Sequence, residues 1–551
     1  MANIKIRYKN ENYNYEEGIT LLDVSKDFSK EYKHDIIIGM VDNKLTSLDY
    51  KLVKDCTVDF FDINSVKGRQ TYIRGLFFLF VKAVKEVLKC DVRIMYFLEK
   101  GIYCEILSNN LISEVTVEKI KIKMRELKDN KIDIKKITVS RLEAIDYFLK
   151  TNQKDKAKSL RYITNATINL YKMDKSLDYF YGVLPCNTKY INSFNLKYLG
   201  ENKIMLLPPV TYALDEKIKY EKMDKYLDEI KFQSKYLENI NISTSSDLNN
   251  HVSKGDYGDI IRMSETIQNN QLINIVNDIS KSKDIKLILL NGPTSSGDLT
   301  VSNKLMSYLK WKGYDPIYIK IDDFYLDLKD RIVDDEGSID NKLDFIDTNQ
   351  FNKKISELIS GKEVILPKYN LKEAKQEFDE TKKIRLSSNG IIIASGLHAF
   401  SEQLTEMISS KNKCKICIYP LTPLNIDNHT LFKQTDNRLL RKVIKDNKLY
   451  GKTASEVFKN WKKIREDEEE YIYPYVKQAD YVYNTSLVYE LGVLKTYAEP
   501  LLFSITEEDE NYDDAQRLIN IFRMILSIPS EEVPKDSVLR EFIGQSCFKD
   551  L

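Results

Sequence analysis

Residues 285–297 read IKLILLNGPTSSG, and this stretch decides the fold of the chain. Its first six residues form an apolar run suited to a buried strand of a parallel sheet. The glycine loop that follows runs into VSNKLMSYLKWKG, residues 301–313, which has helical spacing. A strand, a glycine loop and a helix in this order are the context of a phosphate-binding loop, in which backbone N–H groups and the helix N-terminus surround phosphate.

The loop departs from the working pattern G-x-x-x-x-G-K-[S/T] directly after its second glycine. Gly292 and Gly297 have the expected spacing, but Asp298 replaces the lysine and Leu299 replaces the Mg²⁺-holding hydroxyl. A carboxylate about 4 Å from a phosphate charge is unfavourable by roughly 4 kcal/mol at an effective dielectric near 20. We therefore expect little or no phosphoryl transfer here. The candidate nucleotide-binding residues are Gly292, Thr294, Ser295, Ser296, Gly297, Asp298, Leu299 and Thr300.

Two alternatives would rescue the loop. A one-residue bulge would present the hydroxyl of Thr300, although helix geometry rotates that residue about 100° away from the required position. In the second alternative, Asp298 itself ligates Mg²⁺. No residue then takes the place of the lysine that stabilises the transition state.

Length and composition predict a soluble protein of several domains. At roughly 100–200 residues per domain, 551 residues correspond to about three to five domains. The formal net charge of +1 is too small to attract the whole molecule to nucleic acid. A local basic face that binds nucleic acid remains an alternative. The start MANIKIRYKNENY lacks an apolar leader and no apolar stretch approaches the roughly 20 residues that span a bilayer, so we expect a cytoplasmic location and no membrane partner.

Cysteine and histidine usage argues against disulfides and metal. The seven cysteines are odd in number and scattered. Only Cys414 and Cys417 form a C-x-x-C, in the strand-like KCKICIY, where we expect them on opposite strand faces. The four histidines are spread over different regions, so neither zinc nor another metal is expected.

The chain divides into five segments. Residues 1–63 read as a small β-rich unit in which Thr20 is placed as a helix N-cap. Residues 64–212 are mixed α+β, and residues 213–283 form a helical linker interrupted by the polar loop STSSDLNN. Its interleaved acids and bases leave a basic RNA-binding face as the less favoured alternative. The phosphate-loop domain, α/β with a parallel sheet, covers residues 284–505, and a helical tail covers residues 506–551.

The front of the chain resembles part of a tRNA synthetase. The runs GITLLDVS, VDNKLTSLDYKL and VDFF resemble the TGS domain, a β-grasp module that opens threonyl-tRNA synthetases. Residues 64–212 look like the second additional domain of threonyl- and alanyl-tRNA synthetases, whose editing site uses His-x-x-x-His and Cys-x-x-x-His pairs. Here Cys186 stands four residues before Tyr190, where the resemblance requires histidine. A zinc or deacylation site is thus excluded on ligand count, while RNA remains a partner that the front end would bind.

Five further runs in the C-terminal half extend the phosphate-loop pattern. They are IKIDDFYLD (319–327), LPKYNLKEAKQEF (366–378), IIASGLHAF (392–400), LTPLNIDNHTLFKQTDNRLLRKVIKD (421–446) and SVLREFIGQS (537–546). Together they resemble the phosphoribulokinase/uridine kinase family, in the long bacterial form with a TGS and synthetase-like front end. The resemblance implies ATP-dependent phosphoryl transfer to a nucleoside with Mg²⁺.

The same resemblance implies roles for individual residues. Asp322 matches the base that accepts the proton of the nucleoside hydroxyl. Ser395 stands where the family has the acid that orients Mg²⁺, and Tyr450 precedes Gly451 where the lid has arginine. His398 is expected to be a packed pocket residue, and the run EDEEE at 466–470 a solvated helix face. The substrate and lid candidates are Asp323, Tyr325, Tyr369, Ser395, His398, Arg438, Arg441, Lys445 and Arg465.

Two functional hypotheses follow. The first is a uridine kinase-like protein of weak or lost activity that takes a nucleoside. The second is a non-catalytic pseudokinase whose front end and emptied cleft bind RNA, a nucleotide or a protein partner. Retention of five family residues favours a residual ligand pocket, namely Gly292, Gly297, Asp322, Arg438 and Arg441. The changes at Asp298, Leu299 and Ser395 favour the pseudokinase.

Overall fold

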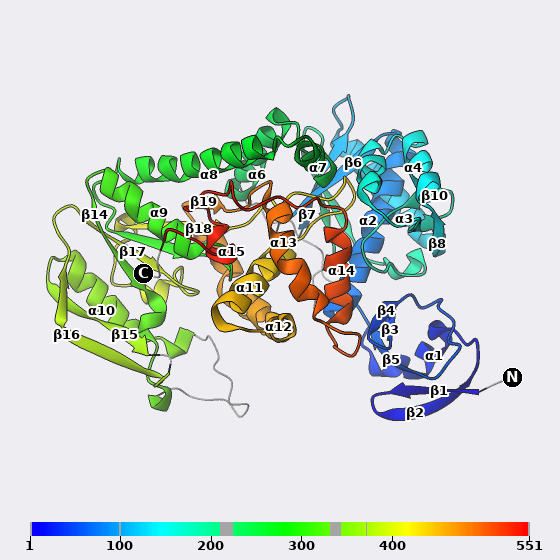
Figure 1. Ribbon diagram of the computed structural model, residues 1–551, viewed down its shortest axis with the longest axis horizontal. Helices are drawn as coiled ribbons and strands as arrows, with labels where there is room; N and C mark the ends of the chain where they lie inside the picture. Colours follow the sequence, from blue (N-terminus) through cyan, green and yellow to red (C-terminus); the bar gives the residue numbers. More distant parts are fainter. Residues whose placement is uncertain (1–2, 99–100, 210–223, 331–342, 371, 549–551) are drawn as a thin grey trace.

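The computed structural model describes residues 3–98, 101–209, 224–330, 343–370 and 372–548. Figure 1 shows the N-terminal domain at one end of the molecule and the two-stranded ribbon of residues 363–370 and 375–385 at the other. Within the described ranges, no helix is both long and apolar enough to cross a membrane.

The N-terminal domain is a five-stranded mixed sheet with one helix. The strands are β1 (Asn3–Tyr8), β2 (Glu11–Glu16), β3 (Ile38–Val41), β4 (Lys44–Thr46) and β5 (Cys56–Phe61), in the order β2-β1-β5-β3-β4. Strand β1 runs parallel to β5, and the other pairs are antiparallel. Helix α1 (Leu21–Phe28) begins after Thr20, whose side chain accepts a hydrogen bond from the Asp23 N–H, so the predicted N-cap is confirmed.

The second region is mixed α+β, as predicted. One sheet has the order β11-β12-β7-β6 and a second the order β10-β9-β8. The strands are β6 (Asp91–Leu98), β7 (Gly101–Leu107), β8 (Ile134–Ser140), β9 (Thr167–Met173), β10 (Ser176–Asp178), β11 (Asn195–Gly200) and β12 (Lys203–Leu207). The helices are α2 (Val66–Leu88), α3 (Glu114–Asp129), α4 (Arg141–Lys150) and α5 (Lys154–Ser159). Helix α2 is buried along most of its length, because its apolar residues surround the whole helix.

The predicted linker is helical but is packed against the rest of the chain. Its helices are α6 (Asp224–Asn239), α7 (Ser245–Lys254) and α8 (Tyr257–Ile279), and residues 213–223 lie outside the described residues. The predicted polar loop STSSDLNN is wrong, because most of it belongs to α7. Thr244 and Asp247 form a capping box, which turns a run of polar residues into a helix start.

The central sheet of the C-terminal half is entirely parallel, as predicted. Its strands are β13 (Leu287–Asn291), β14 (Asp315–Lys320), β17 (Gly390–Ser395), β18 (Lys413–Tyr419) and β19 (Tyr481–Asn484), in the order β14-β17-β13-β18-β19. Helices α8 and α9 (Asp298–Trp311) pack on one face, and α6 and α10 (Thr348–Ile359) on the other. Cys414 and Cys417 are free thiols. Cys414 is part of the core on one face of the sheet and Cys417 is part of the core on the other, so their predicted placement on opposite faces is confirmed.

The remaining elements frame the carboxyl ends of these strands. They are the antiparallel ribbon of β15 (Glu363–Asn370) and β16 (Lys375–Arg385), and helices α11 (Gln434–Tyr450), α12 (Ala454–Tyr471), α13 (Glu490–Phe503), α14 (Tyr512–Phe522) and α15 (Arg540–Ile543). In Figure 1, α15 lies close to α9 and α11 rather than extending away from the domain. The predicted tail is therefore an integral part of the fold, and its buried side chains join those of α11 and α13 in one core.

The segment of residues 424–432 ties the sheet domain to the second region. The Asn425 side chain donates to the carbonyls of Ile94 and Met95, at 2.8 and 3.1 Å, and the Ile94 N–H donates to the Asn428 carbonyl. The imidazole of His429 is fully buried between the carboxylates of Asp91 and Asp178, 2.7 Å from each. Burial alone would lower the pKa of His429, but these two carboxylates raise it to about 9.

Candidate functional site: a phosphate loop held by carboxylates

The loop between β13 and α9 needs both of its glycines. A Cβ on Gly292 would lie 2.3 Å from the Ile418 carbonyl oxygen, so the backbones of the loop and β18 touch there. Gly297 has φ +95°, in the left-handed region, and its Cβ would lie 2.2 Å from a methyl of Val538. The C-terminal segment, residues 530–548, therefore covers the loop at its second glycine.

Glu468 of α12 binds the first part of the loop. Its carboxylate accepts hydrogen bonds from the Thr294 N–H at 2.9 Å and from the Arg438 guanidinium at 2.5 and 2.9 Å. Arg465 donates to the same carboxylate at 2.6 Å. Arg438 also donates to the Thr294 carbonyl. Arg438 and Arg465, two of the substrate and lid candidates, thus pair with a carboxylate of the chain.

Arg441 of α11 is paired in the same manner. Its guanidinium is fully buried and donates to the Glu490 carboxylate at 2.6 and 3.1 Å. It also donates to the carbonyls of Ser295 and Thr485, and the Thr485 hydroxyl donates to the Ser296 carbonyl. Arg441 therefore holds the loop through backbone oxygens, with its charge balanced by Glu490.

Glu541 of α15 binds the other end of the loop. Its carboxylate accepts from both the N–H and the hydroxyl of Thr300, at 3.1 Å each, and from the Lys445 ammonium at 3.0 Å. The Thr300 hydroxyl is thus used within a regular first turn of α9, which does not fit the bulge alternative. Burial and the carboxylate of Asp298 raise the pKa of Glu541, and Lys445 opposes that shift. Asp298 itself is exposed.

An accessible carboxylate, that of Asp322, lies on the acceptor side of the site, the side where the resemblance places the nucleoside that accepts the phosphoryl group. Asp322 follows β14 and is open to solvent on part of its surface, but protein atoms displace water from much of its surroundings. This burial, reinforced by the carboxylates of Asp298 and Asp323, raises the pKa of Asp322 to about 6. Ser395, at the end of β17, shares a 2.5 Å hydrogen bond with the Tyr318 hydroxyl. A hydroxyl pair therefore occupies the position where the resemblance implies a metal-orienting acid.

Two of the other substrate candidates, Tyr325 and Tyr369, lie near Asp323, the residue that follows Asp322. Asp323 accepts a hydrogen bond from the Tyr369 N–H at 3.1 Å, and the rings of Tyr325 and Tyr369 meet edge to face at 5.8 Å. His398 is buried and packs against the Tyr471 ring at 4.7 Å, as expected for a packed pocket residue.

The resident side chains do not fit ATP with Mg²⁺. A triphosphate needs cations and free N–H donors at the loop, whereas Glu468, Glu541 and Asp298 bring three carboxylates there. The arginines that would balance phosphate are already paired with Glu468 and Glu490.

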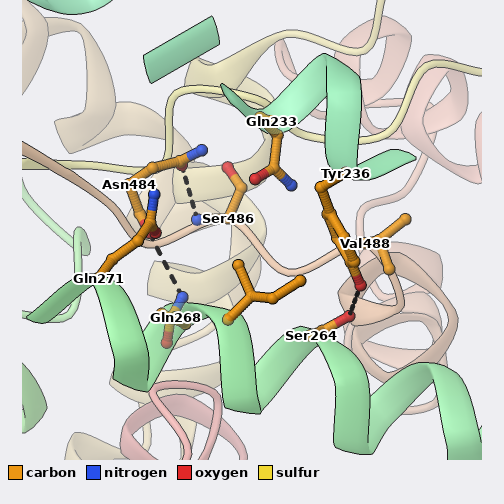
Figure 2. A pocket seen from close by; sticks show the side chains of 9 residues that line it. Gln233, Tyr236, Ser264, Gln268, Gln271, Asn484, Ser486 and Val488 are labelled. Atoms are coloured by element: carbon orange, nitrogen blue, oxygen red, sulfur yellow. Dashed lines mark hydrogen bonds between the residues drawn. The ribbon is translucent and has the colours of Figure 1, made fainter. Parts of the chain in front are cut away.

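A small cavity lies beside this region but is too small for a nucleoside. Its volume is about 10 Å³, room for a single water molecule. Figure 2 shows amide and hydroxyl side chains around it, among them Gln233 of α6, Gln268 of α8 and Ser486. Among the described residues, no group of three or more His, Cys, Asp or Glu side chains is placed to hold a metal ion.

The carboxylates that hold the loop are the residues that the sequence analysis missed. The predicted solvated face at 466–470 is wrong for Asp467 and Glu468, which are buried. Glu468 falls at helical spacing from Trp461 and Ile464 on the inner face of α12, a signal that could have identified it. Glu541 lies inside the recognised run SVLREFIGQS, but nothing in that run indicates its partner.

Comparison with known proteins finds similar proteins for both halves of the chain. Residues 287–488 match the model of the Phosphoribulokinase / Uridine kinase family and are a domain of that family. The N-terminal region is homologous to threonine–tRNA ligases. The chain is 26% identical over 184 residues to the ligase of Acetivibrio thermocellus, covering 33% of this chain and 29% of the ligase. It is 25% identical over 223 residues to that of Finegoldia magna, covering 39% and 35%. The matches thus span about a third of the length of these curated relatives.

Solved structures also align with the chain. A protein from Bacillus stearothermophilus described as a possible uridine kinase aligns with 39% of this chain and 98% of its own, at 14% identity and a TM-score of 0.24. The D-glycerate 3-kinase of Cryptococcus neoformans aligns with 45% of this chain and 80% of its own, at 14% identity and a TM-score of 0.19.

Proposed function

We propose that the kinase-family domain of this chain does not transfer phosphate and works as a binding protein. The observation that carries this proposal is the position of Glu468, whose carboxylate accepts hydrogen bonds from the Thr294 N–H and from the guanidinium groups of Arg438 and Arg465. Phosphoryl transfer depends on positioning and on cations that stabilise the transferring group. A loop whose cations are neutralised by the chain's own carboxylates lacks that stabilisation.

The acceptor side supports a ligand-binding role. Asp322 is accessible and, with a pKa of about 6, is largely ionised at neutral pH, so it can accept a hydrogen bond from a ligand hydroxyl. Aromatic surface lies near this residue, because the rings of Tyr325 and Tyr369 meet edge to face and the Tyr369 N–H donates to Asp323, the residue after Asp322. A nucleoside, with hydroxyls and a flat base, is the ligand class that we propose for this side.

The front end supports a second binding role. The strand order β2-β1-β5-β3-β4 with a single helix supports a TGS-like β-grasp module, and the ligase homology supports a synthetase-like second domain. We infer that RNA is the partner of this front end. The proposal concerns binding alone, because Cys186 is buried and has Tyr190 in the place of a histidine.

Calorimetry tests the main proposal directly. Titration with ATP, with and without Mg²⁺, should give no heat of binding, while uridine should bind and the Asp322→Asn variant should bind it more weakly. Tight Mg²⁺-dependent ATP binding together with uridine-dependent ADP release would overturn the proposal. Absence of uridine binding would leave the loss of catalysis standing but remove the nucleoside as ligand.

A further inference from the structure

We propose that the carboxylate of Glu541 is a built-in replacement for a nucleotide phosphate, which holds the phosphate loop in its folded shape without any ligand. The proposal rests on the proposed loss of nucleotide binding and adds the reason why the loop is still folded. It concerns a contact between two parts of one chain that lie far apart in sequence, the start of α9 and the C-terminal segment.

The donors around Glu541 are those that an anion needs at a helix N-terminus. The Thr300 N–H is one of the donors in the first turn of α9 that has no partner within the helix. The Thr300 hydroxyl and the Lys445 ammonium complete a set of three donors around one carboxylate. A bound phosphate would be held by the same three kinds of group, namely a backbone N–H, a hydroxyl and an ammonium.

The burial of the C-terminal segment makes this replacement permanent rather than switchable. Val538, Leu539, Phe542 and Ile543 flank Glu541 and are each at most 1% exposed. If the segment moved away so that Glu541 left the loop, these four apolar side chains would become exposed to water, which the hydrophobic effect opposes. The guanidinium of Arg540 further ties the segment together by donating to the carbonyls of Ser530 and Val533.

The negative charge of Asp298 disfavours a highly charged anion at the start of α9. Asp298 begins α9, two residues before Thr300, and stays exposed. A triphosphate would bring several negative charges to the same turn, whereas Glu541 brings one, which Lys445 balances at 3.0 Å. The substitution of lysine by Asp298 is therefore compatible with the internal anion but not with an external one.

Chemical rescue of Glu541→Ala in the full-length chain tests the proposal. We expect the variant to melt a few degrees below the wild type. Acetate or inorganic phosphate should raise its melting temperature more than sodium chloride at equal ionic strength. The wild type and the control Glu531→Ala, which removes an exposed carboxylate of the same segment, should not respond specifically. Equal responses of Glu541→Ala and the wild type to these anions would overturn the proposal.

A second variant covers the case in which Glu541→Ala does not fold. Glu541→Gln keeps the shape and one acceptor oxygen but loses the charge, and we expect faster amide hydrogen exchange in residues 297–305 than in the wild type. Unchanged exchange would overturn the proposal, whereas ATP binding to the wild type would overturn the proposed function instead, so the two failures are distinguishable.

Discussion

The two carboxylate oxygens of Glu468 accept hydrogen bonds from the guanidinium of Arg438, at 2.5 and 2.9 Å, and both side chains are at least 99% buried. One residue comes from α12 and the other from α11, so the pair joins the two helices behind the phosphate loop. The same carboxylate accepts a hydrogen bond from the Thr294 N–H, so the pair also holds the phosphate loop against the two helices.

Glu468→Gln should destabilise the fold strongly. Loss of the carboxylate leaves the buried guanidinium of Arg438 without its counter-charge, a change that costs about 3–5 kcal/mol when one partner of a buried pair is removed. Urea unfolding measures the loss. Glu469→Gln is the matched control, because Glu469 is 68% exposed and its pairing with Arg465 is a surface contact. Equal stability of the two variants would mean that the buried pair does not hold the loop.

Restoring the three consensus residues alone should not restore ATP binding. The triple variant Asp298→Lys, Leu299→Thr and Ser395→Glu supplies the lysine, the hydroxyl and the acid. It leaves the Thr300 N–H bound to Glu541. Calorimetry with Mg·ATP should therefore still give no binding. Addition of Glu541→Ala as a fourth change should give only weak affinity, because Glu468 still holds the Thr294 N–H, Arg438 and Arg465. Tight binding by the triple variant would show that the internal carboxylates do not control the site.

The sequence predicted the framework of the molecule better than its site, for a physical reason. The strand IKLILL, the loop glycines and the cap at Thr20 are local patterns, set by residues adjacent in sequence. The roles of Glu468 and Glu541 depend on contacts with residues 174 and 241 positions away, Thr294 and Thr300. A local reading of EDEEE as a solvated face cannot include such partners, since charged residues are rarely buried unless they are paired.

Gly297→Ala should destabilise the loop through two separable effects. The left-handed φ of +95° costs an alanine about 1–2 kcal/mol, and its Cβ would meet Val538 at 2.2 Å. Gly313→Ala is the matched control, because Gly313 has φ +86° but no atom within 4 Å of the added Cβ. The Gly297 variant should lose more free energy of unfolding than this control, by the amount of the steric clash.

A double-mutant cycle with Val538→Ala isolates that clash. Val538→Ala removes the methyl that the new Cβ would meet, so the double variant should be more stable than the sum of the single losses predicts. We expect a coupling free energy of about 1–2 kcal/mol, within the usual range for residues in contact. Additive losses would show that the C-terminal segment does not press on the loop at Gly297.

Stability should fall with rising pH because of His429. Its pKa is about 9 in the folded chain, raised by Asp91 and Asp178 against the effect of burial, compared with about 6.5 for an unperturbed histidine. The folded state therefore holds a proton that the unfolded state releases. The stabilisation is complete below pH 6.5 and is lost as the pH rises through about 9. Its contribution to the slope approaches about 1.4 kcal/mol per pH unit in this window.

Urea unfolding between pH 6.5 and 9 measures this slope in the wild type and in His429→Gln. The variant should be less stable at pH 6.5, because glutamine carries no charge to balance the two carboxylates that face the ring. Asp91 then keeps only Lys85 as a cationic partner, and Asp178 only Lys156. It should also lose the part of the slope that comes from the histidine. If His429→Gln keeps the full dependence of stability on pH, another group takes up the proton on folding. His429 is then neutral between Asp91 and Asp178 in the folded chain.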